Sequence, residues 1–164
     1  VEELVHKTPP NNRAYVQVAI RSLSTGKMNH LRFTPSDSVE VIPVTREEYE
    51  YSYLDQSGYH FLHSVTYDDI IVPRELVDGI KGYLVENQKY QVVFTNETVA
   101  AVEPPPAMEF VVAESPEGVK GDSSTNVFKS AKLETGLEVQ VPLFIKPGER
   151  IRINTADGKY LGRA

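Results

Sequence analysis

The sequence predicts an all-β protein built from three small β-barrel domains. Apolar and polar residues alternate with a period of two in nearly every apolar stretch, as in half-buried strands. Turn-forming residues separate these stretches at short intervals, for example in STGK (24–27), DQSG (55–58) and TADGKY (155–160). Many short strands at close spacing are typical of small antiparallel barrels.

The predicted strands follow one another along most of the chain. The alternating stretches are AYVQVAI (14–20), YEYSYLD (49–55), YHFLH (59–63), KYQVVF (89–94) and TVAAVE (98–103). Near the end, Asp157-Gly158 between IRIN and YLGR predicts a hairpin. Only PRELVDGIKGYL (73–84) is helical in pattern, with Pro73 near its start and two internal glycines that keep it short.

Two proline-containing stretches divide the chain. VEPPPAMEF (102–110) has three consecutive prolines, which form a stiff connector. TPSDSVEVIPV (34–44) is a softer break. We therefore expect a partial β-domain at 1–42, a small barrel at 43–106 and a final small barrel at 107–164.

Charge is distributed unevenly over these three parts. The net charge of −6 comprises five Lys/Arg against four Asp/Glu in 1–42, four against eleven in 43–106, and eight against eight in 107–164. The first and last parts of the chain are therefore suited to contact phosphate groups of a partner, whereas the acidic middle part is poorly suited to such contact. The absence of cysteine fits a reducing, cytoplasmic location, and no apolar run is long enough for a membrane helix. The chain opens at Val1 inside a strand pattern, so we expect N-terminal residues to be missing.

Residues with catalytic or metal-binding potential do not form a recognisable set. His60 and His63 are three apart on a predicted strand, so they point to opposite faces and cannot bind one metal ion. Nucleophile-elbow, phosphate-loop and zinc-protease motifs are absent, which predicts no enzyme activity and no cofactor. Tyr49, Tyr51 and Tyr53 share one strand face and either stack on bases or pack within the barrel wall; the surrounding acids favour packing.

The C-terminal stretch KSAKLETGLEVQVPLFIKPGERIRINTADGKYLGR (129–163) closely resembles the signature of the bacterial translation elongation factor P family. The signature positions are Lys129, Ala131, Gly136, Val139, Val141, Pro142, Ile145 and Gly148. GVKGDSSTN (118–126), YSYLDQSGYHFL (51–62) and TGKMNHLRF (25–33) extend the similarity over the chain. The resemblance implies a KOW-like (SH3-like) first domain followed by two OB-folds, arranged in an L shape like tRNA.

The resemblance also implies a function in translation. Members of this family bind the 70S ribosome between the peptidyl-tRNA and exit sites, and stimulate peptide-bond formation at consecutive prolines. The implied mechanism is positioning of the peptidyl-tRNA, without covalent chemistry. Ribosomal RNA and ribosomal proteins are the further expected partners, and the factor is expected to be a monomer. The rival interpretation is an OB-fold oligonucleotide-binding module outside translation, or a divergent ribosome-binding paralogue.

The loop HKTPPNNRAY (6–15) resembles the family loop whose apical lysine points toward the peptidyl-transferase centre. That lysine is often enzymatically extended, and other branches carry a modified arginine. Gap-free alignment places Asn11 at the apex, among the loop-tip residues Pro9, Pro10, Asn11, Asn12 and Arg13. Three alternatives follow: the proline-stiffened loop works unmodified, Arg13 supplies the cation, or the chain is a paralogue with another ribosomal task.

The third domain contributes further candidate RNA contacts by the same resemblance. Gly121, Asp122 and Ser123 match the family's RNA-contacting loop, with Ser123 in place of the usual threonine. Lys129 is a candidate for phosphate contact, and Tyr160 and Arg163 match the family's Tyr-x-x-Arg ending. These two are three apart on a predicted strand, so they are expected to face opposite sides.

Overall fold

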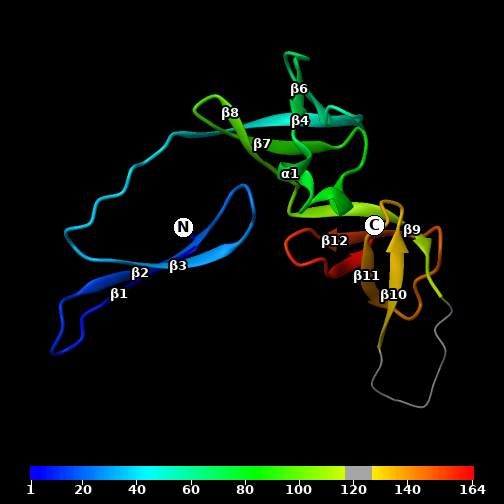
Figure 1. The fold of residues 1–164 in the computed structure, drawn as a ribbon. Helices are drawn as coiled ribbons and strands as arrows, with labels where there is room; N and C mark the ends of the chain where they lie inside the picture. Colours follow the sequence, from blue (N-terminus) through cyan, green and yellow to red (C-terminus); the bar gives the residue numbers. More distant parts are fainter. Residues whose placement is uncertain (117–126) are drawn as a thin grey trace.

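The computed structural model, which describes residues 1–116 and 127–164, confirms the all-β fold class with three antiparallel sheets (Figure 1). The first sheet has the order β1-β2-β3. Its strands are β1 (Glu3–Lys7), β2 (Tyr15–Arg21) and β3 (Met28–Phe33). No helix among the described residues has the length and apolar character needed to cross a membrane.

The second sheet has the order β6-β5-β4-β7-β8. Its strands are β4 (Val44–Leu54), β5 (Tyr59–His63), β6 (Asp69–Val72), β7 (Lys89–Thr95) and β8 (Thr98–Glu103). Between β6 and β7 lie the short helix α1 (Arg74–Val77) and the 3₁₀ turn η1 (Lys81–Tyr83). The helical prediction for 73–84 is thus confirmed as two short pieces.

The third sheet repeats the topology of the second. Its strands are β9 (Ala107–Glu114), β10 (Phe128–Leu133), β11 (Glu138–Pro142), β12 (Arg150–Asn154) and β13 (Tyr160–Arg163), in the order β11-β10-β9-β12-β13. In both of these five-stranded sheets the first strand is central, the second and third lie on one side, and the fourth and fifth on the other. The predicted hairpin at Asp157-Gly158 joins β12 and β13, and Gly158 has a φ of 71° that this turn requires.

The second and third sheets share one hydrophobic core. Phe61 and Tyr90 of the second sheet belong to the same buried cluster as Phe110 and Ile151 of the third. At the junction the Thr135 hydroxyl donates a 2.7 Å hydrogen bond to the Gly82 carbonyl. Gly82 allows this close approach, because a Cβ there would lie 3.0 Å from Leu137 Cδ1. These contacts hold the two domains together.

The first sheet stands apart from this core. Its only buried residues are Val18 and Ala19 on the central strand β2, and neither belongs to the shared cluster. Residues 34–43, which contain no strand, connect β3 to β4 as an extended segment (Figure 1).

The tyrosine stripe of β4 is interrupted by a β-bulge. Tyr49 and Tyr51 are buried in the core, which confirms the prediction that they pack within the barrel wall. Tyr53 is 50% exposed, because the pairing of β4 with β5 shifts between Tyr51 and Tyr53. The prediction of three tyrosines on one face is therefore wrong for Tyr53, which stacks on His60 with ring centroids 4.2 Å apart.

His60 is the one buried polar residue among the described positions, and it bridges two carboxylates. Its Nε2 lies 3.0 Å from Asp55 and its Nδ1 3.2 Å from Asp69. Burial lowers the pKa of His60, but the hydrogen bonds and charges of Asp69 and Asp55 outweigh burial and raise it above its ordinary value. Hydrogen bonds from Ser57, reinforced by His60, lower the pKa of Asp55 to about 2. The His60 ring, placed between two carboxylates, thus ties the β4–β5 turn to β6.

This bridge predicts a pH window for stability. Because the pKa of His60 is raised in the folded state, its contribution to the free energy of unfolding is complete below the ordinary value of 6.5. This contribution is lost as pH rises through the folded-state pKa. The lowered pKa of Asp55 means that its contribution is lost as pH falls through about 2. Thermal unfolding of the parent and His60→Gln should therefore differ most near pH 5, and the difference should shrink as pH rises through the folded-state pKa of His60. A difference that grows toward pH 8 would contradict the charged bridge.

The junction between the second and third sheets predicts a second stability effect. Thr135→Val leaves the Gly82 carbonyl without its donor, so the free energy of unfolding should fall by about 1 kcal/mol. Urea unfolding followed by circular dichroism measures this loss. The control Thr25→Val changes an exposed threonine of the first domain and should leave the main transition unchanged. Equal midpoints for all three proteins would show that this hydrogen bond does not stabilise the junction.

Candidate functional site

The loop between β1 and β2 closes in a tight turn with Asn11 at its tip. The Asn12 amide donates a 3.4 Å hydrogen bond to the Pro9 carbonyl, so Pro10 and Asn11 are the two central residues of the turn. Proline at the first central position sets the backbone φ that such turns require. Pro10, Asn11, Asn12 and Arg13 are all exposed, and Pro9 is half-buried. The structure therefore brings all five predicted loop-tip residues together in one exposed turn.

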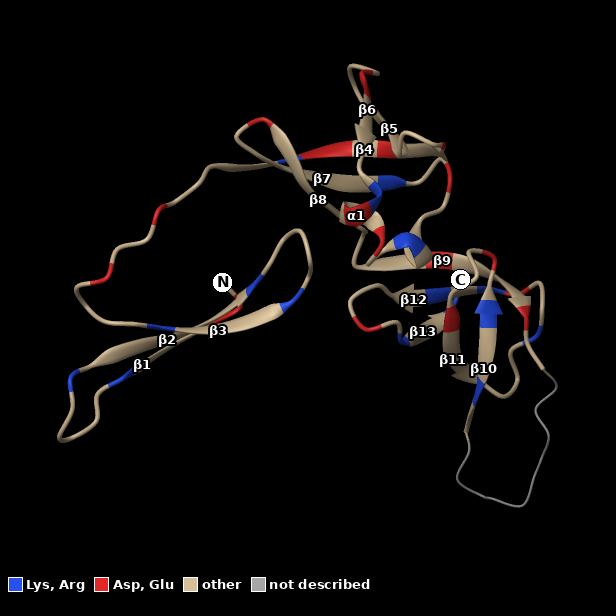
Figure 2. Cartoon of the chain, viewed as in Figure 1, with Lys and Arg blue, Asp and Glu red and all other residues tan. Residues whose placement is uncertain are grey.

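Positive charge surrounds the base of this loop. Lys7 ends β1, Arg13 precedes β2, and Figure 2 shows basic segments on both sides of the loop. The Arg32 guanidinium lies 3.7 Å from the centre of the Tyr15 ring, next to the Lys7–Tyr15 pair. Within the described residues, the Arg13 side chain has neither a hydrogen-bond nor an ion-pair partner. An exposed cation without an internal partner is available to an external phosphate.

The candidate residues of the third domain lie in different surroundings. The Lys129 ammonium donates a 2.8 Å hydrogen bond to the Pro116 carbonyl. Tyr160 packs against the core, and Arg163 is exposed and lies 3.3 Å from Glu149. The prediction that these two residues face opposite sides is wrong, because an irregularity in the β12–β13 pairing places them opposite Ile153 and Ile151, which share one face of β12. The predicted loop residues Gly121, Asp122 and Ser123 lie outside the described residues. Sequence reasoning missed Phe144, which is 56% exposed and sits below the Arg163 guanidinium.

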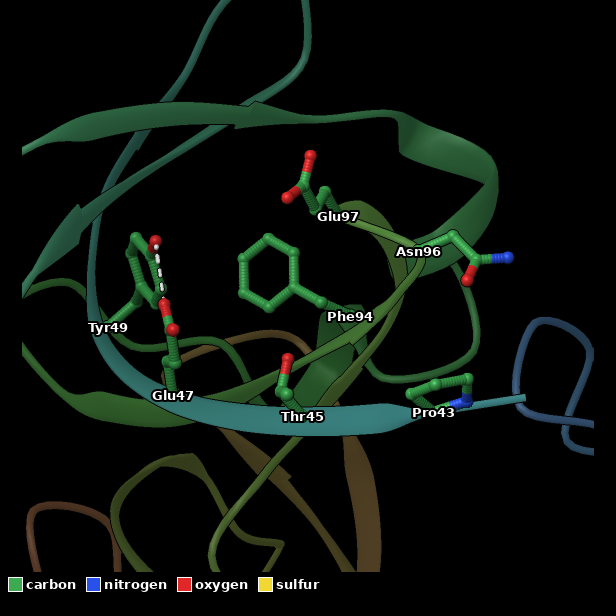
Figure 3. A pocket seen from close by; sticks show the side chains of 7 residues that line it. All are labelled: Pro43, Thr45, Glu47, Tyr49, Phe94, Asn96 and Glu97. Carbon is green, nitrogen blue, oxygen red and sulfur yellow. Dashed lines mark hydrogen bonds between the residues drawn. The ribbon is translucent and has the colours of Figure 1, made fainter. Parts of the chain in front are cut away.

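A hollow of about 670 Å³ opens on the second domain (Figure 3). It is lined by Pro43, Thr45, Glu47, Tyr49, Phe94, Asn96 and Glu97. The Tyr49 hydroxyl donates a 3.5 Å hydrogen bond to Glu47, and burial, together with the Glu47 charge, raises the pKa of Tyr49. The phenol therefore stays protonated at neutral pH, and the two glutamates of the lining repel phosphate.

The histidines and carboxylates of the described residues were candidates for metal binding. Among them, no group of three or more His, Asp or Glu side chains is arranged to hold a metal ion. His60 and His63 point to opposite faces as expected, since His60 stacks on Tyr53 and His63 meets the core residue Tyr49 edge-on at 4.9 Å.

Three family models match consecutive parts of the chain. The model described as elongation factor P (EF-P) KOW-like domain matches residues 1–39. The elongation factor P (EF-P) OB domain model matches residues 44–102, and the elongation factor P C-terminal model matches residues 108–163. Each match contains the strands of one of the three sheets almost completely. Only Glu103, the last residue of β8, and Ala107, the first residue of β9, fall outside the matches.

Curated relatives agree with these models. Elongation factor P from Acidithiobacillus ferrooxidans is 37% identical over 156 residues, which are 95% of this chain and 84% of the relative. Elongation factor P 1 from Porphyromonas gingivalis is 36% identical, covering 99% of this chain and 87% of the relative. The relative from Parafrankia sp. is 38% identical over 96% of this chain. By these similarities the chain belongs to the elongation factor P family of translation elongation factors.

Proposed function

We propose that this factor binds the ribosome beside peptidyl-tRNA and stimulates peptide-bond formation where consecutive prolines slow it. The observation that carries the proposal is the exposed, proline-stiffened turn with Asn11 at its tip and cations at its base. A stiff, positively flanked loop fits the approach to the acceptor end of a tRNA, which presents phosphates and unpaired bases. The 70S ribosome, peptidyl-tRNA, ribosomal RNA and ribosomal proteins are the proposed partners.

The proposed mechanism is positioning. Proline is a rigid nucleophile, and a Pro-Pro peptidyl end holds the reacting groups poorly. A loop that braces the tRNA acceptor end reduces the entropy lost in reaching the reactive geometry, and it needs no reactive group of its own. Pro9 and Pro10 lower the cost of ordering the loop on the ribosome, because they restrict the free loop beforehand.

The tip chemistry distinguishes this factor from the family pattern. Asn11 has neither an amine nor a guanidinium that a modifying enzyme could extend. We propose that the loop works without modification, through its proline stiffness. The alternative is that Arg13, exposed two residues further on, provides the cation that meets the tRNA. A paralogue with another ribosomal task is the third alternative.

The charge distribution suggests how the factor would be oriented. Acidic side chains gather on β4 of the second domain, whereas basic side chains flank the loop of the first and lie on β10 and β12 of the third (Figure 2). We propose that the second domain faces solvent or a basic ribosomal protein. The first domain and the third-domain candidates would then meet RNA. The latter are Gly121, Asp122, Ser123, Lys129, Tyr160 and Arg163.

Translation of a reporter with three consecutive prolines tests the proposed function. Full-length factor made without modifying enzymes should relieve the stall in a reconstituted system, and so should Asn11→Ala if the stiff loop suffices. Arg13→Ala should reduce relief only if Arg13 supplies the cation. A parent protein that binds ribosomes but leaves the stall unchanged would overturn the proposal for the unmodified protein.

Loop stiffness predicts a separate effect of the prolines. Replacing both Pro9 and Pro10 with alanine raises the entropy of the free loop, so stall relief at limiting factor should fall by about two- to fivefold per proline. The dose dependence of reporter synthesis measures this shift. Pro35→Ala, in the segment after β3, is the matched control and should behave like the parent. An unchanged dose dependence of the double variant would argue against stiffness as the source of activity.

A further inference from the structure

A second hollow, of about 580 Å³, lies on the third domain beside the C-terminal end of β11. It is lined by Ser115, Lys129, Leu143, Phe144, Ile145, Lys146 and Pro147. The two charged residues of this lining are lysines, in contrast to the glutamates of the second-domain hollow. A basic hollow of this size, with an aromatic ring in its wall, is a candidate ligand site.

The turn that carries Phe144 is held rigidly from both sides. Ile145 is completely buried, and its amide donates a 3.1 Å hydrogen bond to the Pro142 carbonyl. The Ser115 hydroxyl donates a 3.1 Å hydrogen bond to the Ile145 carbonyl. Anchoring Ile145 inside the core leaves the preceding side chain, Phe144, directed outward on a fixed backbone.

Phe144 is a large apolar side chain that this anchoring leaves 56% exposed. The Arg163 guanidinium lies 4.8 Å from the centre of its ring. A cation over a ring holds that ring in place and covers only part of it. A flat aromatic surface, fixed in position and still largely exposed, is suited to stacking with another flat group.

The two lysines supply the positive charge of the hollow. Within residues 1–116 and 127–164, Lys129 donates a single hydrogen bond, to the Pro116 carbonyl, and an ammonium group has three protons to donate. Lys146 is exposed at the other side of the lining. The nearest acid on the same turn is Glu149, whose carboxylate accepts one hydrogen bond from the Lys146 amide and is paired with Arg163 at 3.3 Å. The described lining of the hollow therefore carries a positive charge.

We propose that this hollow binds a short single-stranded segment of RNA, with one base stacked on Phe144 and the adjoining phosphates beside Lys129 and Lys146. Aromatic side chains beside lysines are the usual means by which proteins hold single strands, because every base has a stacking face and every linkage a negative charge. Paired RNA would not fit, since its bases are stacked on one another. The inference rests on the proposed ribosomal function, which supplies the RNA, and assigns it a specific contact.

Tryptophan fluorescence gives a direct test, because the chain contains no tryptophan. Phe144→Trp places a single indole on the stacking surface of the full chain. Phe128→Trp is the matched control, since Phe128 is 55% exposed on the same domain but is absent from this hollow. Both variants are titrated at low salt with a ten-nucleotide oligoadenylate, free or annealed to its complement, after circular dichroism has confirmed that they fold.

The single strand should quench Phe144→Trp saturably, and bind at least about fivefold more tightly than the duplex, as expected from the stacking of one base. Adding Lys146→Ala should weaken binding and reduce its salt dependence, whereas adding Lys132→Ala, an exposed lysine outside the lining, should not. Equal quenching of the two tryptophans, or equal quenching by the base-free polyanion heparin, would overturn the proposal.

Photocrosslinking on the ribosome identifies the source of the RNA. A photoreactive benzoylphenylalanine in place of Phe144 should crosslink to messenger, transfer or ribosomal RNA, and sequencing the crosslink distinguishes these. Crosslinks to protein alone would overturn the RNA contact. Stall relief is measured separately: RNA binding without stall relief would contradict the polyproline function and leave this site standing, and the converse result would contradict only this site.

Discussion

Burial of one apolar face of each sheet is the constraint on which the rest of the structure depends. The second and third sheets satisfy it jointly, because Phe61, Tyr90, Phe110 and Ile151 belong to one cluster. Gly82 permits the close approach that joins them. The first sheet buries only Val18 and Ala19, and it is tied to the others through residues 34–43. The loop with Asn11 therefore projects from a small sheet beside a larger, firmly packed unit.

The alternation of apolar residues predicted β2, β5, β7 and β8 and the C-terminal part of β4, and Asp157-Gly158 predicted the hairpin of β12 and β13. It did not single out β3, β6, β9, β10 or β11. The short helical segment followed from Pro73 and the two glycines. Alternation could not predict the bulge that turns Tyr53 out of its stripe, because a bulge adds a residue without changing the residue types. It also could not predict the bridge of His60 with Asp55 and Asp69, since strand pairing brings Asp69 to His60 from nine residues away. The repeated topology of the second and third sheets was likewise not evident from the alternation, although the family resemblance implied two OB-folds.

The candidate site was predictable to a similar degree. Pro9, Pro10 and the asparagines predict an exposed turn from local chemistry alone, and the hydrogen bond between Asn12 and Pro9 agrees with it. The surroundings of Lys129 were not predictable, because Phe144 and Lys146 reach it only through the folding of the third sheet. Taken together, the factor presents two surfaces suited to RNA, a stiff loop on the first domain and a basic hollow on the third. The acidic second domain separates them along the chain.

We propose above all that the turn at Asn11 reaches the acceptor end of peptidyl-tRNA. Because the chain has no cysteine, Asn11→Cys provides a unique attachment point for an iron chelate that cleaves nearby RNA. On ribosomes stalled at consecutive prolines, iron at position 11 should cleave the acceptor end of peptidyl-tRNA, whereas iron at Ser24→Cys, in the β2–β3 turn, should not. Cleavage of the acceptor end from Ser24→Cys but not from Asn11→Cys, or no cleavage of it from either position, would contradict this placement of the turn.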